Sequence, residues 1–394
     1  MYIDLDKYLG THSQGYVIKT LEFDDNKPII NTIVAGYASV KPEQREMKED
    51  FLFDVASLTK YVTAILVYKA IEENLLSFET KVSAIEPKFT KLDDITIQDL
   101  LAHRQEIWTE GYLGDCQTKE DFYNIIHTAY VKETDRKYMD VDYIILSMLL
   151  EKVYNKNLSE ILNEKIIKPL NLKNTTYNPE DTTKIVSNNY DYVTKFFGMN
   201  KEDILDFIYP GVPHDNKANI AKNLGIYLGH AGIFTTAEDF LKILSTLIDD
   251  SYLLLNKETI NKMLEHDDTE GLNRIKLIKC GVKNVSDINE LFNEAKQLTG
   301  QTKGDFSPYL SSYNYSGTRY RNTIDELNDI PKRASQNSIT FSGYTGPIFL
   351  IDFDKKIIVL VMSNVCHESK TDRHTRKDTS VRLVEEIYNK VVGE

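Results

Sequence analysis

Ser57 and Lys60 are two residues of this sequence whose types and spacing could do chemistry together. They form the tetrapeptide Ser-Leu-Thr-Lys at the start of an apolar stretch. Residues three apart on a helix share a face, and the N–H groups at a helix start favour negative charge developing on a serine oxygen. Burial would disfavour a charged Lys60, and a neutral lysine can take the serine proton. The pair predicts a nucleophilic serine; a helix-capping serine beside an unrelated surface lysine is the structural alternative.

The elements that would position this pair come from both ends of the chain. Residues 57–75 predict a helix that is apolar on nearly all sides and therefore buried. Strands are predicted before it, at 15–23 and 27–40, with the polar turn FDDNKP between them. Short β-rich stretches return near the end of the chain, at 338–342, 347–353 and 356–363, and a final helix is predicted over 376–392.

This order predicts an α+β fold in which one antiparallel sheet is built from both chain ends and flanked by helices. Residues 1–78 and 335–394 would form the sheet lobe, and residues 79–334 a large, mainly helical inserted lobe. Within the insertion, residues 268–337 are polar and show no clear pattern. The seam between two lobes is a natural place for a cleft.

The composition excludes several classes of function. A net charge of -13 argues against nucleic acid and against an anionic membrane surface as partners. No apolar run reaches the roughly 20 residues of a membrane span. Three dispersed cysteines, without a CxxC, indicate neither a disulfide scaffold nor a zinc ribbon. These cysteines and an N-terminal stretch unlike a signal peptide predict a cytoplasmic protein, and a trimmed secreted form is the alternative. The sequence leaves the oligomeric state open.

Five segments, in order, resemble the serine β-lactamases and low-molecular-weight penicillin-binding proteins, especially the class C branch. FDVASLTKYVTA (53–64) is similar to the nucleophile segment of that family. The resemblance covers most of the chain except about 180–210 and 255–337. The four segments that follow are ITIQDLLAHRQEI (95–107), the stretch 137–179 beginning KYMDVDY, LGHAGIFTTAEDFLKIL (228–244) and the stretch 341–364 beginning FSGYTGPIF.

The resemblance implies that the phenol of Tyr138 faces Ser57 and Lys60 and that the three move protons together. A phenol of ordinary pKa about 10 works as a base only if neighbouring cations lower its pKa, which Lys60 could do. Asp140 occupies the Asn place of the family's Tyr-x-Asn motif. An ionised aspartate cannot donate hydrogen bonds, but it could anchor Lys60 as a salt partner and keep that lysine charged.

Phe341 is the largest departure from the family pattern. In Phe341-Ser342-Gly343 it stands where the family has Lys or His, the cation that would bind a substrate carboxylate. The rest of the strand is intact, with Gly343 allowing substrate near the backbone. The amides of Ser57 and Tyr344 would form the oxyanion hole.

The sequence therefore predicts a serine hydrolase that forms an acyl-enzyme on amide or ester substrates, without a cofactor. Small molecules or short peptides, such as D-amino-acid peptides from cell-wall turnover, are the candidate substrates, for a carboxypeptidase, aminopeptidase or esterase activity. His230 with His214 and Asp215 matches no standard zinc motif, so no metal is predicted. The alternative is a catalytically impaired relative that binds or senses a ligand, which Phe341 and Asp140 favour; turnover of an activated ester would discriminate the two.

Overall fold

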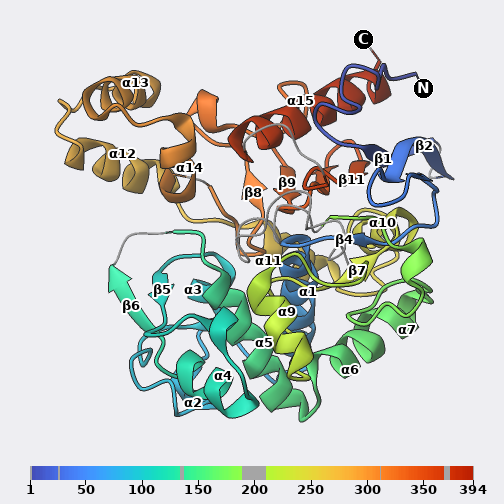
Figure 1. Ribbon diagram of the computed structural model, residues 1–394. Helices are drawn as coiled ribbons and strands as arrows, with labels where there is room; N and C mark the ends of the chain where they lie inside the picture. Colours follow the sequence, from blue (N-terminus) through green and yellow to red (C-terminus); the bar gives the residue numbers. More distant parts are fainter. Residues whose placement is uncertain are drawn as a thin grey trace.

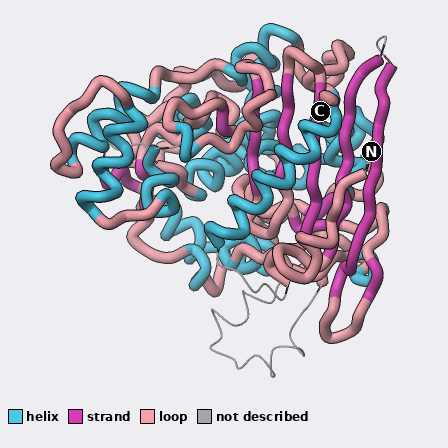
Figure 2. Tube along the Cα trace, turned by 90° about the horizontal axis from the view of Figure 1, so that it is seen from above, coloured by secondary structure: helices cyan, strands magenta, loops and turns pink. Residues whose placement is uncertain are grey.

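The computed structural model describes residues 2–24, 27–133, 137–188, 210–310, 312–367 and 373–393. Seven strands form one sheet, and the view of Figure 2 shows the longer strands lying side by side. They are β1 (Gly15–Asp24), β2 (Lys27–Ser39), β3 (Arg45–Glu46), β8 (Arg319–Tyr320), β9 (Ser338–Ser342), β10 (Ile348–Asp352) and β11 (Ile357–Ser363).

The sheet joins the two ends of the chain. Its strand order is β3-β2-β1-β11-β10-β9-β8, and every neighbouring pair is antiparallel. The first long strand lies against the last, with Tyr16 opposite Ser363. The predicted fold class is thereby confirmed, whereas the division into two lobes stays a prediction. The expected turn between β1 and β2 includes residues 25 and 26, which lie outside the described part of the chain.

The described helices are α1 (Leu58–Glu72), α2 (Val82–Ile85), α3 (Ile97–Leu101), α4 (Lys119–Ile126), α5 (Asp140–Tyr154), α6 (Leu158–Leu162), α7 (Lys168–Leu170), α9 (Asn216–Asn223), α10 (Ala237–Ser245), α11 (Lys257–Leu264), α12 (Thr269–Lys279), α13 (Ile288–Thr299), α14 (Lys303–Leu310) and α15 (Arg373–Val391). Of these, α10 packs on β1 and β11 from one face of the sheet, and α15 packs on β10 and β11 from the other. Short 3₁₀ turns lie at Leu113–Asp115, Thr182–Lys184 and Asp325–Leu327, and a π-helical segment at Asn163–Ile167. Within the described residues, no helix is long and apolar enough to cross a membrane.

Alternation along the strands divides the core into two layers. Successive strand residues point to opposite faces, so Tyr16 and Ile18 of β1 pack on the side of α15, with Leu383. Val17, between them, belongs to the larger core that contains α1, α5 and α10. Helix α1 is buried along most of its length, as predicted, and Tyr61 packs against Phe349 of β10 with ring centroids 5.0 Å apart.

The polar segment 268–337 forms a separate helical group, in the upper left of Figure 1. Helices α12, α13 and α14 pack around their own small core, which includes Leu291, Phe292 and Phe306. The segment also contributes the edge strand β8, whose Arg319 lies opposite Thr340 of β9. This placement brings residues of the unassigned segment to the edge of the strand that carries Phe341.

Candidate active site

The nucleophile segment is a tight turn between a short strand and the buried helix. Strand β4 (Phe53–Asp54) pairs with β7 (Phe234–Thr235), which places the turn beside the Gly-rich segment 228–235. Ala56 has φ +45°, a left-handed conformation that an L-residue adopts at an energetic cost. Ser57 follows as the N-cap residue of α1. The turn therefore presents Ser57 at the end of a rigid, buried helix.

Asp54 fixes this turn, although no pattern in the sequence marks it as a site residue. One oxygen of its carboxylate accepts from the Ala56 N–H at 2.8 Å and the other from the His214 N–H at 2.7 Å. Its backbone carbonyl accepts from Thr345 Oγ1 at 2.7 Å. Burial raises the pKa of Asp54 to about 6, although the two amides that it binds oppose this. One residue thus ties the nucleophile to the loop before α9 and to the turn after β9.

Ser57, Lys60 and Tyr138 meet as the resemblance implied. The Nζ atom of Lys60 donates to Ser57 Oγ at 3.3 Å and to the His230 carbonyl oxygen at 3.2 Å. The same Nζ lies 4.8 Å from the centroid of the Tyr138 ring. The Tyr138 hydroxyl interacts with both the Lys60 ammonium and the Ser57 hydroxyl, and both interactions favour the phenolate. Three side chains suited to nucleophilic attack and proton transfer are therefore in mutual contact.

The structure favours a charged Lys60 over the neutral lysine that burial alone predicts. Burial lowers the pKa of Lys60, but the carboxylate of Asp140, with Oδ1 2.7 Å from Nζ, outweighs it and the pKa lies well above its usual range. Asp140 is the salt partner that the sequence suggested. Its pKa lies well below the usual range, because Lys60 and Lys217 outweigh the effect of burial.

Tyr138 lies in an aromatic setting that works against its ionisation. Burial raises the pKa of Tyr138 above its ordinary value, and the opposing effect of Lys60 is not sufficient to bring it below that value. The rings of His103, Tyr313 and Phe341 lie with centroids 4.6, 5.7 and 6.3 Å from that of Tyr138. A cation at position 341 would favour the phenolate, whereas the phenyl ring of Phe341 adds to its desolvation.

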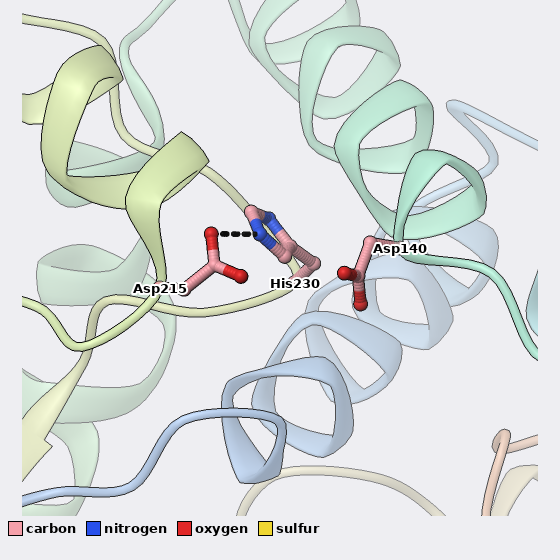
Figure 3. A group of neighbouring side chains, drawn as sticks. All are labelled: Asp140, Asp215 and His230. Atoms are coloured by element: carbon pink, nitrogen blue, oxygen red, sulfur yellow. Dashed lines mark hydrogen bonds and ion pairs between the residues drawn. The ribbon is translucent and has the colours of Figure 1, made fainter. Parts of the chain in front are cut away.

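A chain of ion pairs and hydrogen bonds extends behind Asp140. Its second oxygen, Oδ2, lies 3.1 Å from Lys217 Nζ, and Lys217 is also 3.1 Å from Asp215 Oδ2. Asp215 Oδ1 in turn lies 2.9 Å from His230 Nε2, the contact drawn as a dashed line in Figure 3. Figure 3 shows Asp140 at the start of α5, facing His230 and Asp215 across the site. Lys217 and His230 were not among the predicted site residues, because their place depends on the fold.

The cleft that these residues line has a volume of about 400 Å³. Lys60 lies beneath its floor, with a side chain that is 1% exposed. The cleft brings the other predicted site residues together: Ser57, Tyr138, Asp140, Phe341, Ser342, Gly343 and Tyr344. The structure therefore gathers every predicted residue at one place, and the role of each stays a proposal.

The turn that follows β9 carries the predicted oxyanion-hole residue Tyr344. Gly343 donates its N–H to the Pro347 carbonyl oxygen at 2.7 Å and accepts from the Gly346 N–H at 3.1 Å, which closes the turn that contains Tyr344. The ring of Tyr344 stacks on His214 with centroids 5.2 Å apart. Tyr344 and Ser57 line the same cleft, and the pairing of their amides as an oxyanion hole stays a prediction.

Gly343 is required by close packing against the nucleophile turn. A Cβ atom at position 343 would lie 2.4 Å from the backbone carbonyl oxygen of Val55. Besides the substrate approach expected of this glycine, the residue that follows β9 must lie close to the residue that follows β4.

We expect Gly343→Ala to destabilise the protein, because backbone rather than a flexible side chain blocks the added carbon. Overpacking of this kind costs about 1–3 kcal/mol, so Tm should fall in differential scanning calorimetry. Gly271→Ala in α12 is the matched control: its added Cβ meets no atom within 4 Å among the described residues, and alanine is the better helix former. Equal melting temperatures for the Gly343 variant and the native protein would contradict the packing argument.

Asp140, Asp215 and His230 are also the residues that could hold a metal ion, since their ligand atoms all lie within 4.8 Å of one another. The two carboxylates are, however, already bound by ammonium groups, at 2.7 Å by Lys60 and at 3.1 Å by Lys217. His214, which was weighed beside His230 as a metal ligand, contacts the Asn188 carbonyl oxygen at 2.8 Å. The donor set fits an ion-pair chain.

Comparison with known proteins agrees with this geometry. A family model described as Beta-lactamase matches residues 22–381. An N-acetylmuramyl-L-alanine amidase of Bacillus subtilis is 28% identical over 52% of this chain and 51% of its own length. A putative D-alanyl-D-alanine carboxypeptidase of Escherichia coli is 26% identical over 56% of this chain and 58% of its own length. The chain thus spans about half the length of the curated relatives that it matches.

A solved structure extends the likeness over nearly the whole fold. The class C β-lactamase of Rhodobacter sphaeroides superposes with a TM-score of 0.61 at 15% identity, covering 96% of this chain and 97% of that one. One sheet built from both ends of the chain, together with a buried helix that carries the serine and the lysine at its start, defines the β-lactamase and transpeptidase fold class. The match of the family model over most of the chain shows that this protein belongs to the Beta-lactamase family.

Proposed function

We propose that the protein is a serine hydrolase that forms an acyl-enzyme at Ser57 on ester or amide substrates. The observation that carries the proposal is the contact among Ser57, Lys60 and Tyr138 at the floor of the cleft, with Ser57 Oγ 3.3 Å from Lys60 Nζ. An isolated serine hydroxyl is a weak nucleophile, and activation needs a neighbouring group that takes its proton.

The reaction would run in two halves. Ser57 Oγ adds to the substrate carbonyl while its proton passes to the Tyr138–Lys60 pair; the tetrahedral intermediate then collapses, the bond to the leaving group breaks, and the pair returns the proton to that group. Water attacks the acyl-enzyme with the same pair as base and releases the acid. Because the pKa values of Lys60 and Tyr138 are both raised, the pair holds its protons at neutral pH. Activity should therefore rise as the solution becomes alkaline.

Cell-wall D-amino-acid amides and esters are the substrates that we favour. The names of the two curated relatives refer to N-acetylmuramyl-L-alanine and to D-alanyl-D-alanine. Although Phe341 removes a cation from β9, Arg319 and Lys377 line the same cleft and share the carboxylate of Asp329. Arg319 keeps its charge, whereas burial and the neighbouring Arg319 lower the pKa of Lys377 to about 8. Near neutral pH this group therefore has more positive than negative charge, which supports a substrate with an acidic group. The cytoplasmic location of the protein stays a prediction.

A ligand-binding protein with impaired catalysis is the second candidate. Its support is the raised pKa of Tyr138 and the packing of Phe341 where the family has a cation. Contact among Ser57, Lys60 and Tyr138 favours the hydrolase, because a binding role does not need all three.

Intact-mass spectrometry after exposure to a penicillin, and separately to an activated D-alanyl ester, tests the hydrolase proposal. Native protein should gain the mass of the acyl group, and Ser57→Ala should not. If neither reagent adds mass to folded native protein, the hydrolase proposal is wrong and the binding protein becomes the better interpretation. The reagent that acylates faster identifies the substrate class.

Replacement of Phe341 by lysine tests the missing cation. We expect Phe341→Lys to move the alkaline rise of kcat/KM to lower pH, because a cation beside the Tyr138 ring lowers the pKa of its phenol, by about 1 unit or more for an opposite charge at short range. Phe341→Met is the matched control, since it keeps an apolar side chain of similar volume. The measurement is kcat/KM for a nitrophenyl ester from about pH 6 to about pH 10, which reaches the ordinary pKa of a tyrosine phenol, about 10, with folding checked at each pH. Identical profiles for the Lys and Met variants would show that charge at this position does not reach Tyr138.

A further inference from the structure

Asp140 uses its two carboxylate oxygens on two different lysines. Oδ1 lies 2.7 Å from Lys60 Nζ, and Oδ2 lies 3.1 Å from Lys217 Nζ. The asparagine of the related Tyr-x-Asn motif is neutral, so the aspartate adds one negative charge beside the nucleophile. Lys217 brings the matching positive charge.

Lys217 is held in this position by the start of helix α9. Asp215, the N-cap residue of α9, accepts from the Ala218 N–H at 2.9 Å with Oδ1 and lies 3.1 Å from Lys217 Nζ with Oδ2. The Lys217 side chain is 17% exposed and lines the cleft. Burial lowers the pKa of Lys217, but Asp140 and Asp215 outweigh it and raise the pKa above its usual range. Lys217 therefore carries its charge at the pH values at which the site would work.

We infer that Lys217 is a positioning residue for the nucleophile site: by binding the second oxygen of Asp140, it sets how strongly Asp140 holds Lys60. The inference rests on the proposed hydrolase function and adds to it a residue from a different helix. Lys217 would act through Asp140, with no contact to the reacting atoms required.

Several other titratable groups face this ion-pair chain. The groups around Lys60, Asp140, Lys217 and Asp215 are Tyr112, Tyr138, Asp142 and His230. Without Lys217, the whole negative charge of Asp140 acts on Lys60 and Tyr138, which stabilises the protonated form of both. Without Asp140, both groups lose their protons more readily. The two substitutions therefore shift the alkaline rise in opposite directions.

The test is a set of four variants assayed for acylation by a nitrophenyl ester across pH: Lys217→Met, Lys217→Arg, Asp140→Asn and the double variant Asp140→Asn/Lys217→Met. We expect Lys217→Met to lower kcat about tenfold at a fixed pH below the alkaline rise of activity, with little change in KM. The factor follows because a shift of that rise by about one pH unit changes the active fraction about tenfold. Asp140→Asn should move the rise to lower pH. Lys217→Arg should restore activity, and the double variant should exceed Lys217→Met, because the neutral amide at position 140 no longer needs a cationic partner.

The rescue separates positioning from a structural role in α9. If Lys217→Met acted only by disturbing the start of α9, changing Asp140 would not restore activity. A double variant that is no more active than Lys217→Met would therefore overturn the inference. Native activity in Lys217→Met would overturn it as well. Lys156→Met is the control for loss of a lysine, since its ion pair with Glu164 at 2.6 Å is exposed and Lys156 follows the far end of α5, the helix that begins at Asp140.

Unfolding by urea distinguishes failure of this inference from failure of the proposed function. If the native protein is not acylated by any ester, the function is wrong, yet the charge coupling can still be measured. Lys217→Met should lower the urea concentration at the midpoint of unfolding. The double variant should recover part of that decrease, because position 140 then no longer carries a negative charge. Additive midpoint changes in the two single variants would overturn the coupling itself.

Discussion

Ser57→Ala should lower turnover of an activated ester by about 10⁴-fold or more, the scale found when a catalytic serine is removed. Ser57 supplies the oxygen that bonds to the acyl carbon, and Lys60 and Tyr138 have no proton to accept without it. The fold should change little, because Ser57 makes no side-chain capping bond to the described part of α1, and such substitutions usually stay within about 0.5 kcal/mol. The measurement is kcat for a nitrophenyl ester, with Tm recorded for the same samples.

A matched serine makes this result specific. Ser245 ends helix α10, where its hydroxyl donates to the Lys242 carbonyl oxygen at 3.0 Å outside the cleft. Ser245→Ala should turn over the ester at the native rate. Equal rates for native protein and Ser57→Ala would mean that the observed turnover occurs elsewhere, and would remove the basis for the acyl-enzyme.

The parts of the site that could be predicted from sequence are those encoded locally. Ser57 and Lys60 are one turn apart on a helix, so the spacing alone fixes that they share a face. Tyr138 was placed by resemblance, because its distance from Ser57 along the chain says nothing about contact. The fold then brings Tyr138 to Lys60 through the start of α5, which packs against α1.

Other contributions depend on elements that meet only in the folded chain. Lys217 reaches Asp140 because α9 begins beside the starts of α1 and α5, and no local pattern marks that lysine. Asp54 looks like an ordinary polar residue between two apolar ones, yet it binds two backbone amides and fixes the left-handed Ala56. The charge of Lys60 also required the structure, since burial and Asp140 change its pKa in opposite directions.

The fold was predictable where periodicity was strong and not where it was weak. The long strands near the two chain ends and helix α1 have clear apolar patterns, so a sheet built from both chain ends was expected. Residues 268–337 were unassigned because their helices bury small apolar faces around residues such as Leu291 and Phe306. Strand β8 is two residues long, which is too short for a periodic signal, yet it carries Arg319 into the cleft.

Lys60→Met should lower kcat by about 10²–10⁴-fold, the usual contribution of a positioned proton-transfer group. The variant also removes the cation that contacts Ser57 Oγ at 3.3 Å and Asp140 Oδ1 at 2.7 Å. Breaking a buried ion pair costs up to about 3–5 kcal/mol, but Lys217 still holds the other oxygen of Asp140. We therefore expect a loss of about 1–3 kcal/mol in urea unfolding, the range for leaving a buried polar group short of a partner.

The double variant Lys60→Met/Asp140→Asn separates the two losses. Stability should recover in large part, because a neutral amide no longer leaves a charge without its partner at the floor of the cleft. Activity should stay low, because methionine cannot exchange a proton with Ser57 or Tyr138. If stability remained low in the double variant, the packing of the lysine stem rather than its charge would govern the fold here. If activity returned, Lys60 would be dispensable and Tyr138 would have to act on Ser57 alone.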